Sequence, residues 1–278
     1  MTSDEVPGAD DGASKVGPLP VNVNKAHQAR SYDYFLGGKD NYAADRAAVD
    51  EHIKIAPDLV FTMRANRAFL GRAVRYLAGE AGIRQFLDIG TGIPTADNVH
   101  EVAQAIAPES RVVYADYDPV VLAHSRALLD SSEVGATVYI DADLRDTGTV
   151  LSQAADLLDF AKPVAVTLIS ILHAIPDADD PHAVVAQIMD AVPSGSYLAI
   201  SHFGRELLPP ETLAALMDSI RRTSVQQYTS RTREQLARFF DGTDLVEPGL
   251  VPVEEWRLDP GAGGEGKSLY WCAVGRKR

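Results

Sequence analysis

The sequence predicts an α/β protein in which a helical lobe precedes a doubly wound, mostly parallel sheet. Three observations predict this fold class. After Gly82, short apolar runs alternate with helical segments, which is the pattern of βαβ units. The run "PVAVTLISIL" is continuously apolar, as expected of a strand that is buried on both faces of a parallel sheet. Before Gly82, the apolar residues recur with a helical period.

Residues 25–82 are predicted to form the helical lobe, and residues 1–24, rich in glycine, proline and aspartate, a disordered tail. Within the lobe we expect three helices, at about residues 25–36, 41–55 and from 58 onward. The third helix carries one buried face, because its residues at alternating spacings of four and three are apolar except for one asparagine: Leu59, Met63, Asn66, Leu70, Ala73 and Leu77.

Residues 83–278 are predicted to form the sheet domain. Strands are expected at Gln85–Ile89, Arg111–Asp116, Thr137–Ile140, Val164–Ile169 and Tyr197–Ser201. Helices are expected between and after them at Thr95–Ala107, Pro119–Leu129, Thr149–Phe160, Pro181–Val192, Pro210–Arg222 and Thr232–Phe240. A strand pair that includes the final run "SLYWCAVGR" completes a seven-stranded sheet with an antiparallel edge.

The composition of the chain restricts what the protein can bind and where it can act. The 278 residues carry a net charge of −13, which argues against nucleic acid, because that affinity depends on Lys and Arg neutralising phosphates. A single cysteine rules out an internal disulfide framework. No stretch reaches the roughly 18 apolar residues of a membrane helix, and the N-terminus lacks the apolar region of a signal peptide. We therefore expect a cytoplasmic protein that binds neither nucleic acid nor membranes, and the oligomeric state stays open.

The stretch "FLDIGTGIPT" follows the first predicted strand, at the edge where doubly wound sheets bind ligands. A dinucleotide site has the pattern G-x-G-x-x-G and rests a pyrophosphate on a helix N-terminus. Here Gly90 and Gly92 are present, but Thr95 stands at the third position and Asp88 would face the pyrophosphate. S-adenosylmethionine (SAM) has no phosphate and carries a positive ammonium and sulfonium. The carboxylate of Asp88 is favourable beside SAM, and the glycines let the backbone approach it.

Acids at the ends of the next two strands test this choice. Asp116 ends the second strand and can bind both ribose hydroxyls, whereas Asp118 is expected to cap the following helix. Asp141 or Asp143, at the end of the third strand, can accept a hydrogen bond from an adenine amino group, and the sequence leaves both open. Three acids in this order favour SAM. Beside the strand ends, the predicted cofactor site also includes Tyr117, Leu144 and Ser170.

This order of acids and glycines resembles class I SAM-dependent methyltransferases, although Pro94 replaces the third glycine of the turn. Longer segments are similar to one bacterial family, the S-adenosyl methyltransferases, formerly catalogued as a domain of unknown function. The segments that carry this resemblance are "ARSYDYFLGGKDNYAADRAA", "RANRAFLGRAVRYLA", "FLDIGTGIPT", "VVYADYDPVVLAHSRALL" and "RTREQLARFFDG". The resemblance spans residues 25–278 and implies a Rossmann-like methyltransferase fold with SAM as cofactor, but no known methyl acceptor.

The resemblance assigns no catalytic residue, so candidates come from position. His173 follows the fourth strand, beside the expected place of a transferred methyl group, and is the candidate base; a structural histidine is the alternative. His202, after the next strand, has the same two interpretations, and two histidines without a carboxylate pattern do not predict a metal site. In the helical lobe, the candidates for the lid or acceptor side are Tyr32, Tyr34, Tyr42 and Asn66.

The function that the sequence favours is methyl transfer from SAM to a small molecule, in which the protein mainly positions the reactants. A SAM-binding protein without catalysis, acting as a sensor or assembly partner, would show the same cofactor residues. An NAD-dependent oxidoreductase is disfavoured by Thr95 and Asp88. We also expect residues 25–55 to form a lid over the cofactor, because their polar and aromatic side chains exceed what packing requires. The alternative is that these helices pack on the far side of the sheet.

Overall fold

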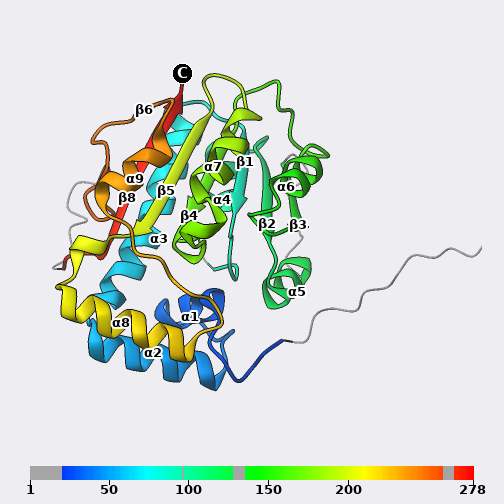
Figure 1. The fold of residues 1–278 in the computed structure, drawn as a ribbon. Helices are drawn as coiled ribbons and strands as arrows, with labels where there is room; N and C mark the ends of the chain where they lie inside the picture. The colour runs from blue at the N-terminus through cyan, green and yellow to red at the C-terminus, as the bar shows by residue number, and fades with distance from the viewer. Residues whose placement is uncertain (1–20, 96, 128–134, 259–265) are drawn as a thin grey trace, which may run out of the picture.

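The computed structural model describes residues 21–95, 97–127, 135–258 and 266–278. Of the predicted tail, residues 1–20 lie outside these ranges. The described chain forms one mixed sheet with helices on both faces and further helices beyond one end of the strands (Figure 1). No helix in the described part of the chain is long and apolar enough to cross a membrane.

The sheet is doubly wound and mostly parallel, as predicted. Its strand order is β3-β2-β1-β4-β5-β8-β6, in which β1 to β5 are parallel and β8 runs antiparallel to both of its neighbours. A two-residue strand, β7, also pairs with β8 and was not predicted. The order reverses between β1 and β4, so a ligand is expected at their carboxyl ends. The strands are Gln85–Ile89 (β1), Arg111–Asp116 (β2), Ala136–Asp141 (β3), Ala165–Ile169 (β4), Tyr197–Phe203 (β5), Thr243–Leu245 (β6), Val251–Pro252 (β7) and Tyr270–Lys277 (β8).

Helices precede the sheet and connect its strands. They are Gln28–Phe35 (α1), Ala43–Ile55 (α2), Leu59–Arg75 (α3), Val99–Ile106 (α4), Pro119–Ala127 (α5), Thr147–Ala154 (α6), Pro181–Asp190 (α7), Pro210–Thr223 (α8) and Arg233–Ala237 (α9). A single π-helical turn, Tyr76–Glu80, continues α3. Short 3-10 turns follow at Leu172–Ala174, Asp177–Asp179, Arg205–Leu207 and Arg238–Phe240.

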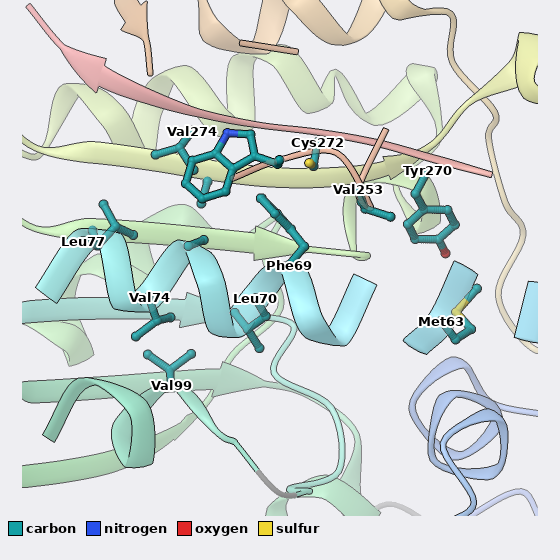
Figure 2. Packing of buried hydrophobic residues seen from close by; sticks show 14 of the residues in the cluster. Met63, Phe69, Leu70, Val74, Leu77, Val99, Val253, Tyr270, Cys272 and Val274 are labelled. Carbon is teal, nitrogen blue, oxygen red and sulfur yellow. The ribbon is translucent and has the colours of Figure 1, made fainter. Parts of the chain in front are cut away.

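The core lies on both faces of the sheet. Side chains of α3 and α4 cover one face, and those of α6 and α7 cover the other. All six residues of the predicted buried stripe on α3 are buried. Figure 2 shows Phe69 and Leu70 of α3 in this core, with Leu77 of the π-helical turn that continues α3 and Val274 of β8. Each large apolar side chain that is fully buried contributes about 1.5–3 kcal/mol to folding, which fixes α3 against the sheet.

Most helices differ by a few residues from their predicted bounds, and for two of them local caps explain where the helix starts. The helix expected from Thr95 begins at Val99, because Asn98 and Glu101 form a capping box immediately before it. The helix expected at 149–160 spans 147–154 instead. Its N-cap is Asp146, whose carboxylate accepts a hydrogen bond from the Thr149 N–H at 3.0 Å.

Helices α1, α2 and α8 lie beyond the carboxyl ends of β4 and β5 (Figure 1). The start of α1 is tied to the end of α8 by backbone bonds: the Ala26 N–H donates to the Thr223 carbonyl oxygen at 3.0 Å, and the Val225 N–H donates to the Ala26 carbonyl oxygen at 2.9 Å. The predicted lobe of residues 25–82 is therefore divided between two places. Its first two helices lie at the strand ends, whereas α3 packs on the face of the sheet.

Candidate functional site at the carboxyl ends of the strands

The loop after β1 holds two glycines with left-handed backbone conformations. Gly90 has φ +76° and Gly92 has φ +68°, which residues with side chains rarely adopt. The Gly90 N–H donates to the carbonyl oxygen of Ala115 at 2.8 Å and so fixes the loop to β2. A Cβ atom on Gly90 would lie 2.5 Å from Cγ1 of Ile171, whereas the nearest atom at Gly92 would be 4.0 Å away. Gly90 is thus required for both its conformation and its close packing.

Asp116 ends β2 and holds the neighbouring loops through its carboxylate. Its Oδ2 accepts from the Gly92 N–H at 2.9 Å, and its Oδ1 accepts from the Asp118 N–H at 2.9 Å. Burial raises the pKa of Asp116, although these two backbone bonds oppose the rise. Each carboxylate oxygen has a further lone pair for a ligand. Asp118 caps α5, as predicted, because its Oδ1 accepts from the Val120 N–H at 2.9 Å.

Asp88 lies near the carboxyl end of β1 and is buried. Burial raises its pKa to about 6, even though the Thr167 and Thr91 hydroxyls donate to the carboxylate and the charge of Arg67 acts in the opposite direction to burial. A positive group in the site would favour the ionised form of this carboxyl, because opposite charges attract strongly where water is excluded.

The structure separates the two acids at the end of β3. Asp141 pairs with Asp116 in the β2–β3 register and is exposed. Asp143 faces the same space as Asp116, and its Oδ2 lies 2.6 Å from a guanidinium nitrogen of Arg145. Hydrogen bonding to Arg145 holds the pKa of Asp143 below its usual range. Of the two alternatives, Asp143 therefore has the position to meet a ligand.

These groups line one cavity of about 370 Å³ at the strand ends. It brings together ten of the predicted site residues: Asp88, Gly90, Gly92, Asp116, Tyr117, Asp143, Leu144, Ser170, Tyr32 and Asn66. Four predicted residues do not line it: Asp141, Tyr34, Tyr42 and His173. The Tyr34 hydroxyl donates to Asp50 at 3.2 Å on the surface, and Tyr42 is the exposed N-cap of α2. In the described ranges, no group of three or more His, Cys, Asp or Glu is placed to hold a metal ion.

The segment that begins α1 forms part of the cavity wall and is held to the sheet by polar contacts. Nδ1 of His27 lies 2.6 Å from Oδ2 of Asp118. Burial opposes ionisation of Asp118, but the bond to His27 and its charge hold the pKa of this carboxyl below its usual range. The side-chain Nε2 of Gln28 donates to the carbonyl oxygen of Ser170. Residues 225–227, from the connection between α8 and α9, complete this side of the cavity.

Tyr32 and Asn66 meet where α1 crosses α3. The Tyr32 hydroxyl donates to the carbonyl oxygen of Met63 at 3.2 Å and accepts from Nδ2 of Asn66 at 2.9 Å. Asn66 is fully buried, lines the cavity, and its Oδ1 has no hydrogen-bond partner among the described residues. A buried acceptor without a partner costs free energy, so Asn66 has a place for a donor from a ligand.

His173 lies behind the cavity wall and is buried. Its Nε2 is 3.2 Å from Nε2 of Gln28, an amide nitrogen that can only donate. Nε2 of the ring is therefore the acceptor, and the proton is on Nδ1. Burial, together with the charge of Arg231, lowers the pKa of His173 to about 3. A ring with this pKa accepts a proton poorly near neutral pH.

Several polar cavity residues were not predicted, among them Gln28, Arg67 and Gln226. For Arg67 the sequence offered a clue, because it directly follows Asn66 on the predicted helix. In the structure it donates to the helix-capping Asn98 at 3.0 Å. For Gln28 and Gln226, no pattern in the sequence indicated a place in the site. The Gln28 N–H donates to Oε1 of Gln226 at 3.3 Å across 198 residues of sequence, and only the folded chain brings such positions together.

Comparisons with known proteins agree with this geometry. A family model described as S-adenosyl methyltransferase matches residues 15–278. A DUF574 family protein of known structure from Streptomyces avermitilis is 44% identical with a TM-score of 0.88, and the match covers 92% of this chain and 100% of that one. A Thermobifida fusca structure, described as a candidate methyltransferase, is 41% identical with a TM-score of 0.83, over 92% and 96% of the two chains. No match was found among curated proteins. The chain therefore belongs to the S-adenosyl methyltransferase family and is a SAM-dependent methyltransferase.

Proposed function

We propose that this enzyme transfers the methyl group of SAM to a small molecule in the bacterial cytoplasm. One observation carries the proposal: the cavity is bounded by the strand ends on one side and by α1 with residues 225–227 on the other. A concave site between two such walls suits a small ligand. The net charge of −13 disfavours a nucleic-acid acceptor, and the single cysteine is compatible with a reducing compartment.

The residues present fit SAM. The unpartnered Oδ1 of Asn66 and the buried carboxyl of Asp88 suit the positive ammonium. Asp116 keeps lone pairs for ribose hydroxyls beside the two glycines of the β1 loop. We assign Asp143, Leu144 and Tyr117 to the adenine side. When bound, SAM supplies a methyl group that its sulfonium already activates, so the protein has mainly to position the reactants.

We propose that residues 25–55 act as the lid of the site, and that α3 belongs with residues 83–278 in the SAM-binding unit. The contacts of His27 and Gln28 with the sheet support a role of α1 in excluding water. Tyr32 supports the same role through its bonds to α3. Tyr34 and Tyr42 then stabilise α1 and α2 from outside.

We assign His173 the positioning of Gln28. The alternative, that it acts as a base, is weaker because its pKa of about 3 and its place behind the wall both oppose proton transfer from an acceptor. His202 is also buried, and burial lowers its pKa as it does that of His173. Its Nδ1 lies 2.8 Å from the Phe203 carbonyl oxygen and must donate, so that its Nε2 accepts from Arg231 at 2.8 Å.

The rival function is SAM binding without catalysis. The test is to incubate the protein with SAM that carries an isotopically labelled methyl group and a protein-free extract of bacterial small molecules. We expect label in a new small molecule together with S-adenosylhomocysteine, and loss of this transfer in Asp116→Ala. SAM binding without any label transfer would favour the rival.

A further inference from the structure

A second, smaller cavity adjoins the cavity at the strand ends, which we call the SAM cavity after its proposed ligand. Its volume is about 50 Å³, and we call it the side cavity. Its lining comes from α1, α2, α3, α8, β5 and β8: Gln28, Ser31, Tyr32, Phe35, His52, Leu59, Met63, Ser170, Phe203, Leu216, Ile220, Ser224, Tyr228 and Tyr270. Three of these residues, Gln28, Tyr32 and Ser170, also line the SAM cavity. The two cavities therefore meet at the end of β4, under α1.

Among the described residues that line the side cavity there is no aspartate, glutamate, lysine or arginine. Burial raises the pKa of the Tyr270 and Tyr228 hydroxyls, and burial lowers the pKa of His52, so all three are uncharged near neutral pH. Figure 2 shows the Tyr270 ring in this region with its hydroxyl directed towards Met63. A charged ligand would lose its water here without gaining an opposite charge, which is costly.

Ser170, at the boundary of the two cavities, has an unusual backbone. Its φ is +59°, a left-handed conformation in a residue that has a side chain. Its N–H donates to the Ser201 carbonyl oxygen at 3.1 Å, and its hydroxyl is 3.0 Å from the Tyr270 hydroxyl. Its carbonyl oxygen accepts from Gln28. Ser170 thus lines both cavities, and backbone strain of this kind gathers at functional sites.

We propose that the side cavity binds the methyl acceptor, and that the acceptor is a small uncharged molecule whose compact apolar end enters it. This inference rests on the proposed function. The cavity of about 50 Å³ is well below the ~150 Å³ that holds benzene, so the inserted part is a few heavy atoms, the size of a branched alkyl group. The reacting atom of the acceptor then lies at the boundary formed by Ser170, Gln28 and Tyr32.

The test is a titration of the full-length protein, saturated with S-adenosylhomocysteine, followed by NMR through the labelled methyl group of Met63. The probes are isopropanol, acetate and isopropylammonium, which are similar in size but differ in charge. We expect isopropanol to shift the Met63 signal and the two ions to bind about tenfold more weakly or not at all. Equal or tighter binding of either ion would overturn the proposal.

Two substitutions locate the binding. Ser31 lines only the side cavity, so Ser31→Leu should fill it and remove the isopropanol shift, whereas Ser31→Ala should keep it. Ser224→Leu should fill the side cavity from another segment of the chain. It replaces Ser31→Leu in the titration if Ser31→Leu does not fold. Unchanged isopropanol binding in a folded, filled variant would overturn the proposal. Because the titration needs no turnover, its failure is distinct from a failure of methyl transfer.

Discussion

The SAM cavity and the side cavity differ in charge and in how the chain builds them. The first is lined by three carboxylates, Asp88, Asp116 and Asp143, that stand at or just beyond the ends of neighbouring parallel strands. The second is lined by uncharged groups from helices and strands that are far apart in sequence. The strand ends thus form a fixed surface that suits the charged cofactor we propose to bind there. The helices leave an apolar space whose shape depends on how they pack.

This difference teaches which part of the site is rigid. In the SAM cavity, the carboxylate of Asp116 and the two glycines are tied to backbone groups of the sheet by short bonds. Around the side cavity, α1 is held mainly by side chains, among them Gln28 and Tyr32, and backbone bonds to the end of α8 fix only its start at Ala26. We therefore expect substitutions in the β1 loop to reduce stability and SAM affinity strongly, and substitutions on α1 to reduce them less.

The largest expected effect is that of Gly90→Ala. Its Cβ would meet Ile171 at 2.5 Å at a positive φ. The expected loss of stability is about 2–5 kcal/mol, from backbone strain of about 1–2 kcal/mol and overpacking of about 1–3 kcal/mol. The matched control is Gly92→Ala, which has the same strain but no close atom. Thermal unfolding and SAM calorimetry should give Gly90→Ala a clearly lower melting temperature and SAM affinity than Gly92→Ala. Equal melting temperatures for the two variants would show that the contact with Ile171 relaxes freely.

The next effect is that of Asp116→Ala on SAM affinity. The substitution removes the bonds to Gly92 and Asp118 and the proposed ribose contact. We expect a loss of about 1.5–3 kcal/mol in binding, the usual size for bonds to a charged group. Asp141→Ala is the control, because Asp141 is the register partner of Asp116 but does not line the cavity. If the two variants bind SAM alike in calorimetry, Asp116 has no ribose role.

The part of the site that the sequence predicts well is the part made of strand ends. The bounds of β1 and β2 were predicted residue for residue, because apolar runs ended by acids and glycines have few other solutions. Asp88, Gly90, Gly92 and Asp116 follow from these bounds and the strand order. The choice between Asp141 and Asp143 required the actual end of β3. The strand ends at Asp141 and Asp143 lies beyond it, so the alternation of side chains along a strand does not decide which of the two faces the cavity.

The remainder of the site depends on contacts between distant segments. Gln28 lies on α1, and its amide meets Ser170 of the β4 end across 142 residues of sequence. The short strands β6 and β7 have no apolar run that distinguishes them from loops. Tyr34 and Tyr42 have a suitable residue type, but Tyr34 bonds to Asp50 on the surface and Tyr42 is the exposed N-cap of α2, so neither lines the cavity. Local patterns hold no information on such pairings.

A third prediction concerns pH. The pKa of Asp88 is about 6 in the folded protein without ligand. Its ionised form favours the positive ammonium of SAM, so SAM affinity should rise with pH and level off above about pH 7. At about pH 5 only about a tenth of Asp88 is ionised, and the affinity should be about tenfold weaker. Calorimetry across this range should show the slope in the wild type and a flatter, weaker profile in Asp88→Asn. Affinity that is independent of pH would mean that SAM does not sense this charge.

The smallest effect is expected at the lid. His27→Ala removes the contact between Nδ1 of His27 and Oδ2 of Asp118, which lie 2.6 Å apart at the edge of the SAM cavity. Because this pair acts on the cofactor only through the position of α1, we expect a loss of only about 0.5–1 kcal/mol in SAM affinity, the size of one net hydrogen bond. Tyr34→Phe is the control on the same helix, since it removes only a surface bond to Asp50, and it should leave the affinity unchanged.

Hydrogen exchange decides whether α1 responds to the cofactor. If residues 25–55 are a lid, SAM should slow exchange along α1 and around its contacts with residues 223–226, which pair with the start of the helix. In His27→Ala, this protection should shrink while that of residues 88–92 remains, because the β1 loop is held by Asp116 and Ala115 instead. Protection confined to residues 88–95, 116 and 141–144 would contradict the lid. It would make α1 a fixed wall of the site, whose position does not depend on the cofactor.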